Sequence, residues 1–231
     1  MAIRHVEEYR DVGLARNLIA KIRDISKRPI RLMEVCGTHT VSIFRSGIRA
    51  VLPETIALLS GPGCPVCVTA QKEIDAFIEL AKIEEVIVTT FGDLMRVPGS
   101  RSSLQKERAE GRDIRMVYST MDALEIARKN PDKKVVFLGV GFETTAPTIA
   151  AAILAAQQMQ CHNFFVYSAH KLVPPALAAL MASETVKIDG FILPGHVSSI
   201  SGELEDELPG WQILVGPREA IGITSFLKNF A

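Results

Sequence analysis

The sequence predicts an α/β fold with two similar lobes, each a parallel sheet flanked by helices, and a cleft between them at the carboxyl ends of the strands. Short apolar runs alternate with segments of helical periodicity along the chain. Of the 231 residues, 48% are hydrophobic, which is enough to bury a substantial core. The two halves also begin alike, because residues 36–40 and 141–145 each follow a predicted strand with a similar pattern. We therefore expect lobes at residues 1–112 and 113–231.

In the first lobe, helices are expected where apolar residues recur at helical spacing, and strands where short apolar runs end at turn residues. The first helix carries Leu14, Leu18, Ile22 and Ile25 on one face. Thr69 is the expected N-cap of a later helix. In order, the expected elements are a helix over residues 14–25, a strand over 30–35, a short helix over 41–45, a strand over 56–60, a helix over 70–83, a strand over 86–91 and a polar helix that ends at 111.

The second lobe continues the alternation of strands and helices. Residues 119–122 have the composition of a helix cap, and Pro147 suits the first turn of a helix. In order, the expected elements are a strand over residues 114–118, a helix to 130, a strand over 135–138, a helix opening near 147, a strand over 163–168, a helix over 175–181, a strand over 190–193, a strand over 211–215 and a closing helix.

Composition and charge exclude several classes of protein. Lysine plus arginine and aspartate plus glutamate balance at 26 each, so no basic field indicates nucleic-acid binding. No apolar run reaches the length of about 18 residues that a membrane span needs. The first residues carry acids and lack the apolar core of a signal peptide, so we expect a cytoplasmic protein. In that compartment the four cysteines are expected to serve redox chemistry or metal binding rather than structural disulfides.

A Cys-x-x-Cys pair, Cys64 and Cys67, lies in the Gly/Pro-rich segment 61–67 that follows a predicted strand. The alternative interpretation is two small buried apolar residues. We reject it because Pro65 and the flanking glycines favour a turn rather than a packed face. Cys67 is expected just before a helix N-terminus, which favours the reactive thiolate. The turn could hold both sulfur atoms within disulfide reach or on one metal ion.

Cys36 and His39 form a second reactive set at the end of the strand over residues 30–35. The alternative is a cysteine in a capping turn and a surface histidine. Gly37 and two threonines supply backbone and hydroxyl donors around the thiol, which favours a metal ligand or a nucleophile. Thiolate with imidazole suits iron, zinc or copper. A four-ligand zinc site is also open if the fold brings this pair to the Cys-x-x-Cys turn.

Other polar side chains also follow predicted strands, at the edge where open α/β sheets bind ligands. They are Asp93, Glu143, His170 and His196. Gly139-x-Gly141 is a weak phosphate signal, because it lacks the third glycine of a dinucleotide fingerprint and the Gly-Lys-Ser/Thr of a P-loop. Glu143 could equally favour a helix dipole, and each histidine taken alone fits a structural role. Cys161 is assigned no function.

Five segments of the chain resemble signatures of the HypD family of [NiFe]-hydrogenase maturation factors, in the order of that family. They are residues 34–40, 61–67, 91–99, 141–145 and 194–198. The resemblance covers roughly residues 5–200. It implies an assembly scaffold, partnered by the small chaperone HypC and then by HypE as cyanide donor. On that scaffold iron receives cyanide and carbon monoxide before delivery to the nickel–iron hydrogenase large subunit.

The resemblance also implies roles for individual residues. Cys36 corresponds to the iron-binding thiolate, and His39 to its neighbour in the iron site. Cys64 and Cys67 correspond to a redox-active pair. The residues that correspond to lining positions of the cleft are Asp93, Glu143 and His196.

The chain departs from the family pattern in two places. Family members are similar to this chain but continue into a cysteine-rich region that binds a [4Fe-4S] cluster, whose ligands we do not find before Ala231. We therefore expect a short form without that cluster. Ala70 and residues 216–219 also differ from the residues usual in the family. Two alternatives to the scaffold stay open: a thiol–disulfide oxidoreductase in which Cys64 attacks and Cys67 resolves, and a docking module that has lost the chemistry.

Overall fold

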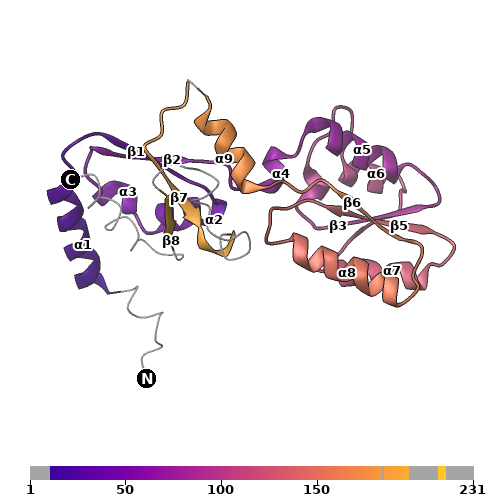
Figure 1. Cartoon of the computed structure of the whole chain (residues 1–231). Helices are drawn as coiled ribbons and strands as arrows, with labels where there is room; N and C mark the ends of the chain where they lie inside the picture. The colour runs from indigo at the N-terminus through magenta and orange to yellow at the C-terminus, as the bar shows by residue number, and fades with distance from the viewer. Residues whose placement is uncertain (1–10, 184, 198–212, 217–231) are drawn as a thin grey trace. The chain divides into compact units, whose positions relative to one another are not determined.

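The chain forms two compact units in a computed structural model that describes residues 11–183, 185–197 and 213–216 (Figure 1). Unit 1 comprises Met1–Gly63 and Pro174–Ala231, and unit 2 comprises Cys64–Val173. The predicted boundary near residue 112 falls inside unit 2 in this division. No helix of the described ranges combines the length and the hydrophobicity that crossing a membrane requires.

Unit 1 is built on a parallel sheet in the order β2-β1-β7-β8. Its strands are β1 (Ile30–Glu34), β2 (Ile56–Ser60), β7 (Gly190–Pro194) and β8 (Ile213–Gly216). Its described residues include the helices α1 (Val12–Ile25), α2 (Gly37–Arg45), α3 (Ile48–Val51) and α9 (Val173–Met181), the last of which begins at the final residue of unit 2. The centre of the sheet therefore joins β1 and β7, which come from opposite ends of the chain.

Local sequence explains how unit 1 forms its elements. The Asp11 side chain accepts a hydrogen bond from the Leu14 amide at 3.0 Å and so begins α1. Ile22 on the buried face of α1 packs against a core cluster with Ile30 and Leu32 of β1. The β1–β7 pairing is reinforced before β7, where Asp189 accepts a hydrogen bond from the Arg31 amide at 2.7 Å.

Unit 2 is built on a second parallel sheet, in the order β4-β3-β5-β6. Its strands are β3 (Val86–Thr90), β4 (Ile114–Met116), β5 (Lys134–Gly139) and β6 (Phe164–Ser168). Its helices are α4 (Pro65–Val68), α5 (Gln71–Ala81), the 3-10 helix η2 (Leu94–Arg96), α6 (Leu104–Ala109), α7 (Thr120–Lys129) and α8 (Ala146–Gln158). In Figure 1, α5 and α6 cover one face of this sheet, and α7 and α8 cover the other.

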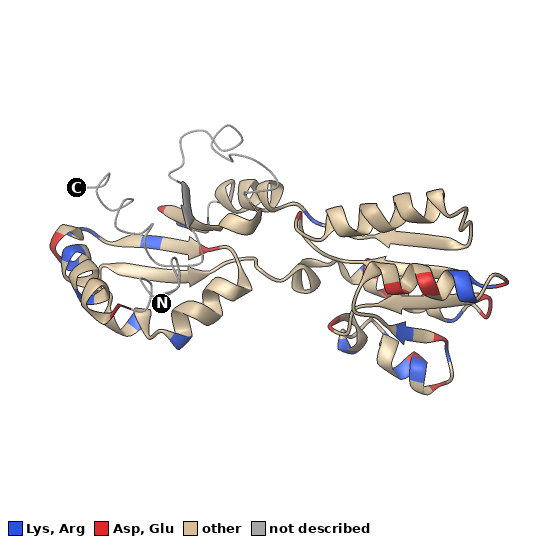
Figure 2. Ribbon diagram, turned by 90° about the horizontal axis from the view of Figure 1, so that it is seen from below, with Lys and Arg blue, Asp and Glu red and all other residues tan. Residues whose placement is uncertain are grey.

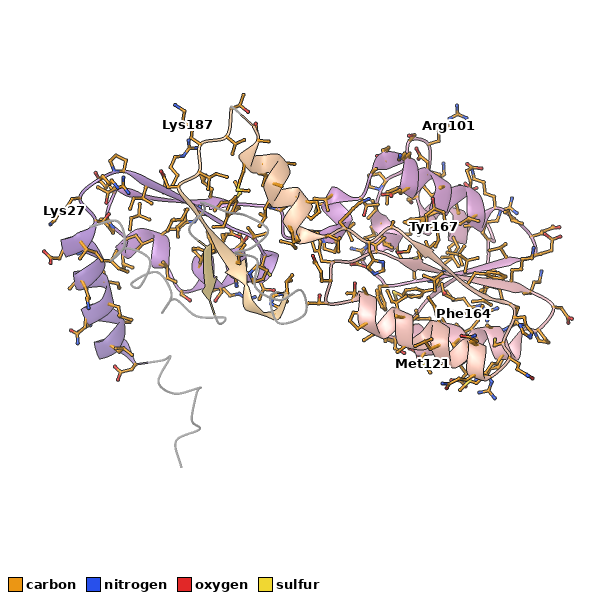
Figure 3. All side chains as sticks on the ribbon, viewed as in Figure 1. Lys27, Arg101, Met121, Phe164, Tyr167 and Lys187 are labelled. Atoms are coloured by element: carbon orange, nitrogen blue, oxygen red, sulfur yellow. The ribbon has the colours of Figure 1, made fainter. Side chains whose placement is uncertain are left out.

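The central strand β5 of unit 2 is apolar on both faces, as expected for a sheet between two helical layers. Val136 and Leu138 of β5 belong to the core under α5, whereas Val135 and Phe137 belong to the core under α7 and α8. The edge strand β6 alternates in the same way, with Tyr167 on the α5 side and Phe164 on the α8 side (Figure 3). Figure 2 shows charged residues on α7 and none on α8.

The predicted fold class is confirmed, since both sheets are parallel and flanked by helices. The predicted cleft between lobes stays a prediction. Two details were wrong. The helix expected over residues 41–45 starts at Gly37, and Ala70 rather than Thr69 is the N-cap of α5. The expected closing helix and the start of the strand over 211–215 lie outside the described residues.

Candidate functional site

Cys36 stands where β1 passes into α2. It is the N-cap of α2, with an extended backbone (φ −175°, ψ 129°), and it is buried. The strand is held in place just before it, where the Val35 amide donates to the Ile192 carbonyl at 3.0 Å. The thiol is therefore at the carboxyl end of the central strand pair of unit 1, beside the first-turn N–H groups of a nine-residue helix.

The loop 61–63 after β2 lies against the backbone on both sides of Cys36. The Gly61 amide donates to the Glu34 carbonyl at 2.8 Å, and the Gly37 amide approaches the Gly63 carbonyl at 3.5 Å. A Cβ atom on Gly63 would meet the Gly37 nitrogen and lie 2.6 Å from the Cys36 carbonyl carbon. Only glycine permits this approach, so the sequence Gly61-Pro62-Gly63 fixes the surroundings of Cys36 as well as leading into Cys64.

His39 follows Cys36 by one helical turn and is buried rather than on the surface. Its Nδ1 atom has no hydrogen-bond partner among the described residues. Burial lowers the pKa of His39; the Glu34 carboxylate and a hydrogen bond with the Ile192 backbone raise that pKa, and His196 lowers it. The ring is therefore held neutral at physiological pH, which is the form that binds metal ions.

Glu34 is a buried acid that the sequence analysis left without a role. Its side chain has an exposed fraction of 0%, and it ends the mostly apolar strand β1. The Thr40 hydroxyl donates to Glu34 Oε1 at 2.6 Å, while Oε2 has no partner in the described part of the chain. An acidic residue inside an apolar run directly before Cys36 was the available signal.

The Cys-x-x-Cys pair lies on α4 in unit 2. Cys64 is the N-cap of α4, and the Cys67 amide donates to the Cys64 carbonyl at 3.1 Å. Both thiols are free, Cys64 half-buried and Cys67 exposed. A hydrogen bond with Cys64, assisted by slight burial, raises the pKa of Cys67. Cys67 thus lies inside α4, whose N-cap is Cys64, and three residues before Ala70, the N-cap of α5. The raised pKa of Cys67 does not fit the expectation that a helix N-terminus favours its thiolate.

Several contacts hold the Cys-x-x-Cys turn on unit 2. The Thr69 hydroxyl donates to the Pro65 carbonyl at 2.9 Å, and Val66 packs against the core under α5. The Ala70 amide donates to Glu73 at 3.1 Å, and Lys171 donates to both carboxylate oxygens of Glu73 at 3.1 Å each. These bonds hold the segment that carries the two thiols in a defined conformation.

The other predicted site residues of unit 2 lie past the carboxyl ends of its strands. Asp93 is exposed, and its carboxylate accepts from the Leu94 amide at 3.0 Å as the cap of η2. Glu143 is buried, and its Oε1 accepts from the Val173 amide at 2.7 Å, while Oε2 has no partner among the described residues. Glu143 therefore holds the start of α9 and does not cap its own helix α8, whose first turn contains no acid.

His170 contacts Ser168, whose Oγ lies 2.8 Å from His170 Nδ1. Its Nε2 atom is buried without a partner in the described ranges. Burial lowers the pKa of His170. Cys161 Sγ lies 3.2 Å from Asn163 Oδ1, ahead of β6 and so away from the carboxyl edge of this sheet.

The structure brings the predicted residues together in two sets. Unit 1 contains Cys36 and His39, with Glu34 and His196 close enough to act on the His39 charge. Unit 2 contains Cys64, Cys67, Asp93 and Glu143. Within the described residues, no group of three or more His, Cys, Asp or Glu side chains is arranged to hold a metal ion. A [4Fe-4S] cluster needs four cysteine thiolates together, and Cys161 stands apart from Cys64 and Cys67 in unit 2, so these residues do not fit one.

Together the fold and these groups define an α/β protein that presents thiols, imidazoles and buried carboxylates at the ends of parallel strands. The family model HypD, described as "Hydrogenase formation hypA family", matches residues 13–207. This match covers most of the sequence. The chain belongs to the HypD family.

The chain is similar to several proteins named "Hydrogenase maturation factor HypD". It is 48% identical over 208 residues to that of Azotobacter vinelandii, covering 87% of this chain and 55% of the relative. It is 47% identical over 207 residues to that of Rhodobacter capsulatus, covering 87% and 55%. It is 45% identical over 207 residues to that of Escherichia coli (strain K12), covering 87% and 56%. The chain thus spans about half the length of the curated relatives it matches.

Proposed function

We propose that this chain provides the iron-binding part of a scaffold for hydrogenase maturation, on which iron receives cyanide and carbon monoxide. The observation that carries this proposal is the pairing of Cys36 with His39 at the start of α2, both buried, with the Nδ1 atom of His39 unpartnered among the described residues. Membership of the HypD family, whose curated relatives are named hydrogenase maturation factors, supports it.

The donor set of unit 1 suits iron as the cargo of this scaffold. Cys36 is the N-cap of α2 and His39 is its third residue, and side chains at these two positions lie near each other, so they can approach the same ion. A thiolate and a neutral imidazole are ligands for borderline metals such as Fe(II). Buried polar atoms without partners are rare in proteins, and here His39 Nδ1 and Glu34 Oε2 both lack one among the described residues. A cation bound by Cys36 and His39 would satisfy the His39 Nδ1 atom.

Cys64 and Cys67 are proposed as the redox pair of the same scaffold. Oxidation of the two thiols to one disulfide releases two electrons and two protons, and reduction takes them up. The mutual hydrogen bond of the thiols on a short, well-anchored turn supports this role. Asp93, Glu143 and His196 are proposed to line the site. A HypC-type chaperone, a HypE-type cyanide donor and a cytoplasmic location complete the proposal.

An infrared spectrum tests the scaffold, because metal-bound cyanide and carbon monoxide absorb where protein is transparent. The protein would be purified anaerobically with its HypC-type partner as wild type, Cys36→Ala and Cys161→Ala. Cys161 is the matched control, since it is a free cysteine that lies outside both site motifs. Bands in the wild type and in Cys161→Ala that are absent from Cys36→Ala are expected. Bands of full intensity in Cys36→Ala would refute the role of Cys36.

A thiol–disulfide oxidoreductase is the second candidate. The exposed Cys67 next to Cys64 favours it, because a partner disulfide could reach this turn. In that reaction Cys64 attacks the partner disulfide and Cys67 then displaces the reduced partner, leaving a Cys64–Cys67 disulfide. Reduction of a model disulfide that survives Cys36→Ala and is lost in Cys64→Ala would favour this candidate. Equal rates in both variants and the wild type would exclude it.

A further inference from the structure

Glu34 occupies a place where an acidic side chain is unusual. It ends β1, the strand that lies between β2 and β7, and it pairs with Ser60 on one side and Ile192 on the other. Its exposed fraction is 0%, whereas glutamate is almost never fully buried without a partner for its charge. Removing a carboxylate from water is costly unless nearby groups compensate it. The burial of Glu34 therefore indicates a specific role for its carboxylate in unit 1.

One oxygen of the Glu34 carboxylate is fixed to the first turn of α2. The Thr40 hydroxyl donates to Oε1 at 2.6 Å, a short hydrogen bond between two oxygen atoms. The same hydroxyl lies 3.4 Å from the Cys36 carbonyl oxygen. Because Thr40 follows His39 directly, this bond holds the helical turn that carries both proposed iron ligands against the end of β1.

The other oxygen has no comparable partner. Oε2 is buried and forms no hydrogen bond with any described residue. Among the described residues, the lysine and arginine side chains form ion pairs with other acidic residues and not with Glu34. The group on which its charge acts is the His39 ring, which is itself buried with Nδ1 unpartnered. The carboxylate and the imidazole are thus both buried, and each keeps one polar atom without a hydrogen bond among the described residues.

We propose that Glu34 is a positioning residue of the Cys36–His39 site: its buried carboxylate holds the first turn of α2 through Thr40 and balances the charge of a divalent cation. This inference rests on the proposed function, since it assumes that Cys36 and His39 bind iron. It adds a residue that touches neither the metal nor a partner. Residues that position a metal ligand without touching the metal typically change the metal affinity about 10- to 100-fold when they are replaced.

Cobalt(II) binding to the full chain tests the proposal, because the cobalt–thiolate absorption that is lost in Cys36→Ala reports this site and needs no partner protein. Glu34→Gln keeps an oxygen that can accept from Thr40 and removes the charge. We expect its affinity for cobalt(II) to fall about 10- to 100-fold, with the absorption band of the saturated site shifted. Glu107→Gln is the matched control, since Glu107 is another buried glutamate, on α6 of unit 2. Its cobalt affinity is expected to equal that of the wild type.

The outcomes separate this proposal from the function on which it rests. A cobalt–thiolate band that is lost in Cys36→Ala but unchanged in position and affinity in Glu34→Gln would overturn the role of Glu34 alone. The same loss of affinity in Glu34→Gln and Glu107→Gln would also overturn it, since the effect would then be general. A wild type with no Cys36-dependent band would overturn both proposals.

A second variant keeps the test decisive if Glu34→Gln does not fold, as judged by circular dichroism. Glu34→Asp retains the charge but withdraws the carboxylate by one methylene group from Thr40 and His39. We expect it to bind cobalt(II) with unchanged stoichiometry and with an affinity between those of the wild type and a variant without the charge. Wild-type affinity and band position in Glu34→Asp would overturn the positioning role.

Discussion

Replacing Gly63 with alanine tests how closely the loop 61–63 must approach Cys36. An added Cβ atom would meet the Gly37 nitrogen and lie 2.6 Å and 2.7 Å from the carbonyl carbon and Cα of Cys36. These are backbone atoms, so no side chain can rotate away to make room. Gly63 is not among the glycines with positive φ, and the cost is therefore steric rather than conformational.

The magnitude follows from the need to move one backbone segment against another. Inserting a methyl group into a well-packed site typically costs 1–3 kcal/mol, and we expect Gly63→Ala to lose about 2–3 kcal/mol, at the upper end of that range. The Gly61 amide should also exchange its hydrogen faster, because displacement of the loop breaks its bond to the Glu34 carbonyl. Urea denaturation followed by circular dichroism, together with hydrogen exchange of this amide, measures both effects.

Gly37→Ala is the matched control, because it makes the same chemical change on the facing segment. The nearest atom to a Cβ on Gly37 is the Gly63 carbonyl oxygen at 3.7 Å, an ordinary contact. Its stability is expected to stay within about 0.5 kcal/mol of the wild type. Equal stability of the two alanine variants, with unchanged exchange at Gly61, would refute the reasoning.

Three further predictions concern unit 2. Burial raises the pKa of Glu73, but hydrogen bonds from Lys171 and the Ala70 amide outweigh it and leave the pKa lowered. Glu73→Gln should therefore lower the free energy of unfolding by about 0.5–1 kcal/mol at neutral pH. This difference from the wild type should disappear as the pH falls from the ordinary pKa of 4.5 through the lowered pKa of the folded state. A difference in urea denaturation that does not change with pH would contradict this prediction. Burial lowers the pKa of His170, so its contribution to stability is complete above 6.5 and is lost as pH falls through the folded-state pKa. In the His170→Gln variant, the free energy of unfolding should fall less steeply with decreasing pH than in the wild type. An unchanged dependence of stability on pH would argue against this prediction. Asn163 Nδ2 lies 2.9 Å from three backbone carbonyl oxygens. Asn163→Asp should therefore lower the free energy of unfolding by about 2–3 kcal/mol, as measured by urea denaturation. A loss below about 0.5 kcal/mol would count against a stabilising role of these hydrogen bonds.

The order and type of the elements could be predicted from the sequence, because βα alternation leaves a strong local pattern. The strand expected over residues 56–60 is β2, and that expected over residues 190–193 lies within β7. Which strands pair with each other was harder to predict from the sequence. β7 pairs with β1, so that Leu32 lies opposite Gly190, and no local pattern specifies a partner so distant in the chain. This long-range pairing is why the division into units differs from a boundary near residue 112.

The site shows the same limit at the level of single residues. Cysteines and histidines at strand ends stand out in a sequence, and the structure places Cys36 and Cys64 at helix N-caps that follow β1 and β2. Glu34 is an acid in a mostly apolar run, but its burial could not be predicted from that signal, because β1 pairs with β7 from the other end of the chain. The position of Cys67 inside α4 was also missed, since a four-residue helix leaves too few positions for a periodic pattern.

The interrupted path of the chain through unit 1 has a consequence during synthesis. A ribosome releases β1 and β2 early, but β7, the second partner of β1, emerges only after the whole of unit 2 has been made. The bond between the Arg31 amide and Asp189 closes a separation of 158 residues, whereas every strand of unit 2 finds its partners within one continuous segment. We therefore expect unit 2 to fold first on the nascent chain, while the segment with Cys36 awaits its central strand partner. The Cys-x-x-Cys turn would then be folded before the proposed iron site is complete.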